Sequence, residues 1–180
     1  MNYQDVFVEC MVKKRMSGKD YLIFLGIGLA GAALIFAGII GFLLTGVLSI
    51  AFFAFVGVIA GAYYLFSRRN IEFEYAVTNG DVSIDKIVSR RSRKRLTSFD
   101  SKDVEEFGDY APKAEALKSR RVDKVIFASA YDDGHESKYV IAKSKKTGMT
   151  LIVFDPDERT VDAIKPFLPR QIRIEMMKQK

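Results

Sequence analysis

The sequence predicts a membrane protein with two parts: a hairpin of two transmembrane helices and a β-rich cytoplasmic domain. About seven antiparallel strands are expected to close into a barrel that one C-terminal helix caps. Three observations support this prediction. The 47 residues from Tyr21 to Ser67 include no charged side chain. From Ile71 onward, apolar and polar residues alternate with a period of two, and a stripe with helical spacing follows Asp155.

The uncharged run is long enough for two membrane spans. A bilayer core about 30 Å thick is crossed by about 20 helical residues, whereas one helix through the whole run would be about 70 Å long. The polar and flexible break at Leu44-Thr45-Gly46 divides the run. We therefore expect a transmembrane hairpin over 21–67, with helices at about 21–43 and 47–66. The acidic residues of the 1–20 leader and the length of the run argue against a cleavable signal peptide.

The charges that flank the run predict its orientation. Basic residues stand on both flanks: Lys13, Lys14, Arg15, Lys19, Arg68 and Arg69. The connecting turn carries no charge, so the positive-inside rule places both termini of a multi-pass cell-membrane protein in the cytoplasm. Aromatic Tyr21 and Tyr63 stand at the expected headgroup level. The single cysteine, Cys10, excludes an intramolecular disulfide.

The rest of the chain is typical of short strands followed by a helix. A first strand over 71–78 leads into Asn79-Gly80, a strong hairpin signal. Further strands are expected over 81–88, 93–99, 104–110, 122–129, 138–144 and 149–154, with a loop or short helical turn over 111–121. Asp155 is the expected N-cap of the last helix, with Pro156 at its first position. Residues 169–180 then form a basic C-terminal tail.

One segment carries a family resemblance. The stretch YAVTNGDVSIDKIVSRRSRKRLTSFDSKDVEEF resembles the opening of bacterial pleckstrin-homology-like domains, in which a Tyr-x-x-Thr-Asn strand end precedes a basic stretch and an Asp-x-x-x-Val-x-x-Phe segment. The matching positions are Tyr75, Thr78, Asn79, Asp100, Val104 and Phe107. The resemblance implies a pleckstrin-homology-like domain over 70–168 in a small two-span protein of Gram-positive bacteria, and no catalytic residues. Many relatives have further basic residues where this chain has Gly80-Asp81.

A basic cluster is the main candidate for function. It consists of Arg90, Arg91, Arg93, Lys94 and Arg95. Each cation near an anionic leaflet contributes about 1 kcal/mol, so the cluster is a candidate contact for lipid headgroups or for a protein partner. The alternative is a solvated hairpin whose charges deter edge pairing. Nucleic acid is not expected, because no recognition helix or aromatic stacking motif accompanies the cluster.

Small residues recur in the two spans. Gly57 and Gly61 form a GxxxG motif in the second helix, and Ala37 and Gly41 form a similar pair in the first. Such residues let helix backbones approach closely. They serve either packing within the hairpin or homodimerisation, and both readings stay open here.

Several function classes lack support in the sequence. The spans contain no ionisable residue, which transport by the chain alone would need. The only histidine, His135, lies among acidic residues in a segment that reads as a polar turn rather than a metal site. No nucleophile motif or phosphate loop is present, so no enzyme activity, cofactor or metal is expected. The sequence predicts a non-catalytic integral membrane protein whose domain contacts the inner leaflet or a protein partner. The alternative is an accessory subunit of a larger membrane complex such as a transporter.

Overall fold

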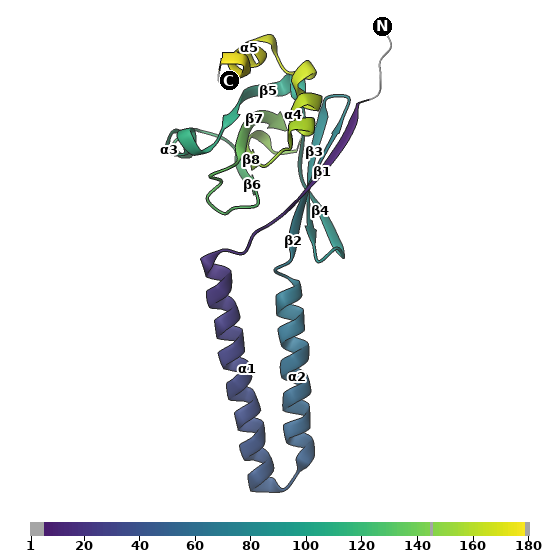
Figure 1. The fold of residues 1–180 in the computed structure, drawn as a ribbon, viewed down its shortest axis with the longest axis vertical. Helices are drawn as coiled ribbons and strands as arrows, with labels where there is room; N and C mark the ends of the chain where they lie inside the picture. Colours follow the sequence, from purple (N-terminus) through teal and green to yellow (C-terminus); the bar gives the residue numbers. More distant parts are fainter. Residues whose placement is uncertain (1–5, 145, 179–180) are drawn as a thin grey trace. The chain divides into compact units, whose positions relative to one another are not determined.

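The structure is a computed structural model that describes residues 6–144 and 146–178, and it divides into two compact units (Figure 1). One unit combines Met1–Arg15 with Ile71–Lys180, and the other is Met16–Asn70. We call the first the β-domain and the second the helical hairpin. The β-domain is thus discontinuous in sequence, because the helical hairpin is inserted into it.

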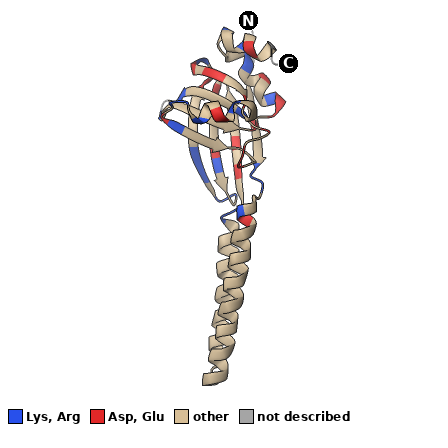
Figure 2. Ribbon diagram, turned by 90° about the vertical axis from the view of Figure 1, so that its left-hand side faces the viewer, with Lys and Arg blue, Asp and Glu red and all other residues tan. Residues whose placement is uncertain are grey.

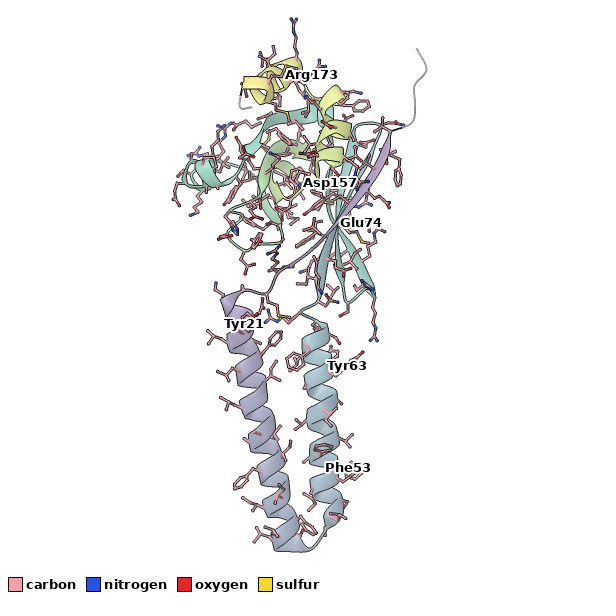
Figure 3. All side chains as sticks on the ribbon, in the orientation of Figure 1. Tyr21, Phe53, Tyr63, Glu74, Asp157 and Arg173 are labelled. Atoms are coloured by element: carbon pink, nitrogen blue, oxygen red, sulfur yellow. The ribbon has the colours of Figure 1, made fainter. Side chains whose placement is uncertain are left out.

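The helical hairpin consists of α1 (Gly18–Thr45) and α2 (Leu48–Ser67). At about 1.5 Å per residue these helices are about 42 and 30 Å long, and both are long and apolar enough to cross a membrane. Gly46 closes α1 with a φ of 73°, which confirms the break expected around Thr45. Figure 2 shows charged residues only at one end of the pair, and Figure 3 shows Phe53 projecting outward from α2.

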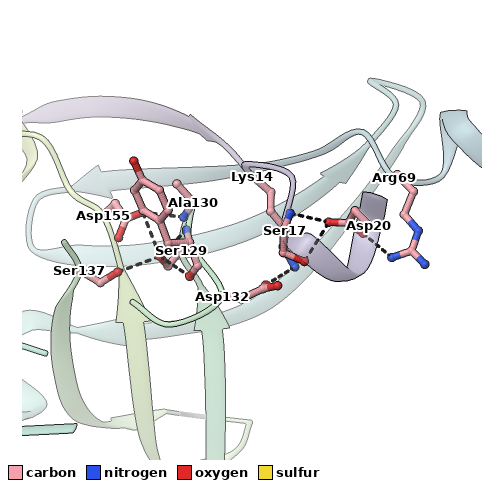
Figure 4. A network of polar contacts seen from close by, with 10 residues as sticks. Lys14, Ser17, Asp20, Arg69, Ser129, Ala130, Asp132, Ser137 and Asp155 are labelled. Atoms are coloured by element: carbon pink, nitrogen blue, oxygen red, sulfur yellow. Dashed lines mark hydrogen bonds and ion pairs between the residues drawn. The ribbon is translucent and has the colours of Figure 1, made fainter. Parts of the chain in front are cut away.

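The charged end of the helical hairpin is held by Asp20. One of its carboxylate oxygens accepts a hydrogen bond from the backbone N–H of Ser17 at 3.0 Å, which caps the start of α1. The other oxygen forms an ion pair with Arg69 at 2.9 Å (Figure 4). Asp20 therefore links the beginning of α1 to the residues that follow α2.

The first sheet of the β-domain, sheet A, is a four-stranded antiparallel meander. Its order is β1-β2-β3-β4, with β1 (Phe7–Lys13), β2 (Ile71–Thr78), β3 (Asp81–Val88) and β4 (Ser92–Asp100). Asn79 and Gly80 both have positive φ, at 50° and 91°, which confirms the predicted hairpin turn. The bounds predicted for the two strands around this turn are also confirmed.

The second sheet, sheet B, has the order β5-β7-β8-β6. Its strands are β5 (Val104–Asp109), β6 (Lys124–Ala128), β7 (Lys138–Ser144) and β8 (Gly148–Phe154). Strand β6 runs parallel to β8, because the segment with helix α3 (Ala114–Lys118) carries the chain past β7 and β8 before β6 begins. The prediction of about seven antiparallel strands in one barrel is therefore wrong. Eight described strands form two separate sheets, and the pair of β6 and β8 is parallel.

Two apolar clusters hold the β-domain together. The larger joins the inner faces of both sheets and includes fully buried Tyr75, Ile84 and Phe154. Helices α4 (Glu158–Ile164) and α5 (Arg170–Lys178) cover this cluster with Ile164 and Ile172. The smaller cluster lies on the other face of sheet B around residues of α3 and neighbouring strands. Burying apolar area on both faces of sheet B explains why its strands are almost continuously apolar.

Three predicted boundaries are wrong. The 1–20 leader is not a separate segment, because β1 pairs with β2 along its whole length. The bounds 70–168 predicted for the domain therefore leave out β1. The 169–180 tail contributes α5, whose Ile172 is buried in the core because the helix has an apolar face. The N-cap of α4 is Asp157 rather than Asp155, since the Asp157 side chain accepts the hydrogen bond from the N–H of Thr160. Asp157 is labelled in Figure 3.

Candidate functional site

The predicted basic cluster lies on the β3–β4 hairpin. The turn between the strands is closed by a hydrogen bond from the N–H of Arg91 to the carbonyl of Val88 at 3.1 Å. Its two central residues, Ser89 and Arg90, have φ of 52° and 57°. This left-handed pair is the geometry of a type I′ turn, which normally takes Asn-Gly because other side chains are strained there. The chain thus presents an arginine at a turn position that favours glycine.

Strand alternation divides the cluster between the two faces of sheet A. Arg95 is directly opposite Asp85, and Arg93 is opposite Ile87, so both arginines lie on the outer face. Lys94 is directly opposite Lys86 and lies on the other face. A β-bulge at Leu96 shifts the register between the buried part of β4 and this charged part. The five predicted residues therefore share one hairpin but do not form one patch.

On the outer face, the two arginines cover two buried carboxylates. Only 3% of Asp85 and 7% of Glu74 is exposed. Arg93 bridges them: its Nε donates to Asp85 at 2.7 Å and its Nη2 donates to Glu74 at 2.5 Å. Arg95 donates to both oxygens of Asp85, in one case at 3.2 Å from Nη2. About half of each arginine side chain remains exposed.

These ion pairs favour the charged form of Asp85. Asp85 and Glu74 are directly opposite each other on β3 and β2, and two like charges in that position are destabilising. Burial acts to raise the pKa of Asp85, but the hydrogen bonds from Arg95 and Arg93 outweigh it and hold that pKa below its ordinary value. Asp85 is therefore ionised at neutral pH, and the two guanidinium groups neutralise the pair.

Arg90 and the two lysines of the hairpin make fewer contacts than Arg93 and Arg95. Arg90 is 82% exposed and approaches Glu72 at 3.6 Å, a distance at which a surface pair contributes little. Within residues 6–144 and 146–178, neither Lys86 nor Lys94 makes an ion pair or a side-chain hydrogen bond. Sequence reasoning missed Lys86 and the carboxylates because it considered a contiguous run. The alternation of β3 and β4, with their register, is the signal that could have found them.

The small residues of the helices have different roles from one another. A Cβ added at Gly38 would lie 2.8 Å from the Cβ of Ala54, and one added at Gly41 would lie 3.2 Å from Ile50. These glycines therefore let α1 pack against α2. In contrast, nothing in the described structure lies within 4 Å of a Cβ built at Gly57 or Gly61.

The predicted packing motifs are thus only partly used within the helical hairpin. Ala37 is exposed, whereas its neighbour Gly38 is the buried residue of α1. Gly41 lies against α2, close to Ile50. Gly57 and Gly61 instead line an open groove of about 410 Å³ beside Gly26 and Ala30. Packing inside the hairpin therefore does not explain the GxxxG motif of α2.

The loop between β6 and β7 holds the end of the N-terminal strand segment (Figure 4). The carbonyl of Ala130 accepts from the N–H of Arg15 at 2.8 Å, and the Arg15 guanidinium lies over the Tyr131 ring at 4.7 Å. Asp132 pairs with Lys14 at 2.7 Å. Asp155 holds the loop by accepting a hydrogen bond from the N–H of Ala130 at 2.6 Å. These contacts fix the chain at the point where it leaves the β-domain.

The turn that resembles a metal site is occupied by internal pairs. His135 Nδ1 lies 2.7 Å from Asp133 and Nε2 lies 3.8 Å from Glu136. The hydrogen bond with Asp133 raises the pKa of His135. Among the residues that the structure describes, no group of three or more His, Cys, Asp or Glu side chains could hold a metal ion.

Comparison with known proteins identifies the family. No curated protein and no solved structure matches the chain. The sequence model of the family described as Bacterial PH-like domain (DUF6106) matches residues 4–174. The match extends over β1, both apolar helices and most of α5, in agreement with a β-domain that contains an inserted helical hairpin. The chain therefore belongs to the bacterial PH-like domain family DUF6106.

Proposed function

We propose that this chain is a two-span membrane protein without catalytic activity, whose β-domain contacts anionic headgroups of the inner leaflet through the β3–β4 hairpin. One observation carries the proposal: the basic turn lies at the end of sheet A where the chain leaves for α1 and returns from α2. Lys13, the last residue of β1, is opposite Glu72, and Ile71, the first residue of β2, is opposite Val88. Val88 is the residue from which the basic turn starts.

The covalent chain limits how far this end of the sheet can be from the spans. Ile71 follows the last residue of α2, Ser67, by four positions. At most about 3.6 Å per residue, the two lie within about 14 Å of each other for any arrangement of the two units. The headgroup region adds about 5–7 Å on each side of the hydrocarbon core. Headgroup contact therefore lies within reach of the turn.

The energy available is modest and suits orientation rather than recruitment. Six cations lie in the turn half of the hairpin, residues 85–95, when Lys86 is counted with the five predicted residues. Glu72, Glu74 and Asp85 offset three of them. About 1 kcal/mol for each net charge gives about 3 kcal/mol, which alone would leave a free protein largely unbound. A domain tethered by two spans already has a high local lipid concentration, so this energy suffices to select one orientation.

The orientation of the spans belongs to the same proposal. Lys19, Arg68 and Arg69 stand at the end of the helical hairpin that continues into the β-domain, and the turn at Gly46 is uncharged. The positive-inside rule supports a cytoplasmic β-domain with both termini on that side. The inner leaflet is also the anionic one, which agrees with a basic hairpin at this end.

A depth measurement on the full chain tests the proposal. A spin label is placed at Ser92→Cys in a Cys10→Ser background, and its accessibility to oxygen and to a water-soluble relaxant is measured in nanodiscs. We expect the label to report headgroup depth when phosphatidylglycerol is present and water when phosphatidylcholine is the only lipid. Replacing Arg90 and Arg91 by Gln should return the label to water, whereas Lys124→Gln should not. A label depth that ignores lipid charge contradicts the proposal.

A second candidate is favoured by one observation on α2. Gly57 and Gly61 line an open groove that packing within the helical hairpin leaves unused. Small residues that allow close backbone approach serve helix association in membranes, which supports an accessory subunit of a larger membrane complex. Purification in mild detergent tests this role: a multi-span partner should co-purify with the parent chain and be lost from Gly57→Leu. A parent chain that purifies without any multi-span partner excludes it.

A further inference from the structure

We infer that Lys86 and Lys94 together form a binding site for a phosphate group. This inference rests on the proposed function and names the part of the β3–β4 hairpin that recognises the ligand. The two lysines come from neighbouring strands and are directly opposite each other, so their side chains leave the same face of sheet A. Only Lys94 belongs to the contiguous basic run, and Lys86 is supplied by the strand before it.

No described acidic side chain compensates the charge of this lysine pair. Directly opposite residues have Cβ atoms about 4.5–5.5 Å apart, and like charges in this position destabilise a sheet. No carboxylate in the described parts of the chain lies within ion-pair distance of either ammonium group. The same hairpin shows the opposite arrangement on its outer face, where Arg93 and Arg95 are each paired with Asp85. An anion between the two lysines would remove the repulsion that the fold leaves in place.

The face on which the lysines lie also favours a ligand. The residue opposite Lys86 on β2 is Phe73, which is buried in the main core, and Val12 follows in the same row. The row therefore passes from the core to half-buried Lys86 and then to exposed Lys94. Lysine stems can cover such apolar surface while their ammonium groups stay in water. A bound anion would compete mainly with bulk solvent.

The charge of the pair favours a phosphate with two negative charges. Two ammonium groups carry a charge of +2, which a phosphomonoester or inorganic phosphate dianion neutralises and a phosphodiester only halves. Lysine binds phosphate as a point charge with three donors and needs no fixed planar fork. The ligand is thus a phosphate group that comes either from a lipid such as phosphatidic acid or from solution.

Lysine labelling of the full chain in nanodiscs tests the site and identifies the source. Acetylation rates are measured by mass spectrometry in phosphatidylcholine alone, in phosphatidylcholine with added inorganic phosphate, and in phosphatidylcholine with phosphatidic acid. We expect Lys86 and Lys94 to be protected in the third condition, and Lys124, an exposed strand lysine, to be unaffected. Equal protection by inorganic phosphate identifies a soluble ligand instead. Absence of protection in both conditions, or equal protection of Lys124, overturns the inference.

Substitution then measures the contribution of the pair. At about 1 kcal/mol for each lysine, Lys86→Gln with Lys94→Gln should weaken binding of phosphatidic acid about 30-fold, and Lys124→Gln should leave it unchanged. Lys86→Gln alone should also return Lys94 to its unprotected labelling rate. If the spin label at position 92 still reports headgroup depth while both lysines stay unprotected, the proposed function holds and this inference fails.

Discussion

Replacing the helical hairpin by a two-residue turn should give a soluble, folded β-domain. The N–H of Lys14 donates to the carbonyl of Ile71 at 2.9 Å, and Lys13 is opposite Glu72. These are the spacings of two strands that a tight turn can join, so Asn-Gly in place of residues 15–70 should close β1 and β2 into an ordinary hairpin. We call this protein the linked domain. The comparison protein is residues 71–180 alone, which lack β1.

The difference in stability between the two proteins follows from what β1 buries. Val6, Val8, Cys10 and Val12 are partly buried against the main core. At about 1 kcal/mol for each half-buried side chain, loss of the strand removes about 4 kcal/mol of hydrophobic stabilisation before any backbone hydrogen bond is counted. Small domains are stable by only about 5–15 kcal/mol. At a urea dependence of about 2 kcal/mol per molar, the unfolding midpoint should fall by about 2 M.

Urea titration followed by far-ultraviolet circular dichroism measures this difference. Within the linked domain, neighbouring residues on opposite faces of β1 provide a matched pair: Val8→Asp should destabilise strongly, and exposed Glu9→Gln should not. If residues 71–180 alone unfold at the same midpoint as the linked domain, β1 is not part of the fold. If the linked domain does not fold, the pairing of β1 with β2 is not what holds the N-terminal part of the β-domain to the part that follows the helical hairpin.

Three further predictions concern single sites. Arg90→Gly should raise the unfolding free energy of the linked domain by about 0.5–1 kcal/mol in urea titration, because glycine relieves the left-handed strain at φ 57°; a loss of stability would show that the turn is not strained. Gly38→Leu should lower the melting temperature of the full chain in detergent, because Ala54 leaves no room for a Cβ, whereas Gly57→Leu should not; equal effects would contradict the packing of α1 on α2. The hydrogen bond with Asp133 raises the pKa of His135, so protonated His135 stabilises the fold at pH values below its unfolded pKa of about 6.5. This stabilisation is lost as the pH rises through the pKa of His135 in the folded protein. The urea midpoint should therefore fall more between about pH 6 and pH 8 in the parent linked domain than in His135→Gln, and an equal fall in both would refute it.

Local signals were sufficient for a large part of the fold. The run without charges predicts α1 and α2, because helix hydrogen bonds join residues four apart and need no partner segment. Asn79-Gly80 predicts the β2–β3 hairpin for the same reason, since a tight turn is decided by its own residues. The basic cluster was correctly placed on one hairpin. In each case the interaction that forms the element lies within a few residues along the chain.

Strand partners across long separations were not predictable in the same way. The leader does show period-two alternation, with Val8 and Cys10 facing the core and Glu9 facing out, but its partner β2 follows only after the whole helical hairpin. The parallel pairing of β6 with β8 likewise depends on a crossing past intervening strands. Asp155 had the sequence features of an N-cap, yet it accepts a hydrogen bond from Ala130, and Asp157 caps α4 instead.

The sequence by itself determined that the chain has two helices able to span a membrane, a set of short strands beyond them and a basic hairpin. Only the tertiary structure decided that β1, which precedes the helical hairpin in the sequence, completes the β-domain. It also decided that Arg93 and Arg95 neutralise Glu74 and Asp85, while no carboxylate in the described parts of the chain pairs with Lys86 or Lys94. The physical reason is that composition and turn chemistry act along the chain, whereas strand register decides which charges meet across it. The charge of the basic hairpin is therefore a property of the sheet and not of the contiguous run Arg90–Arg95 alone.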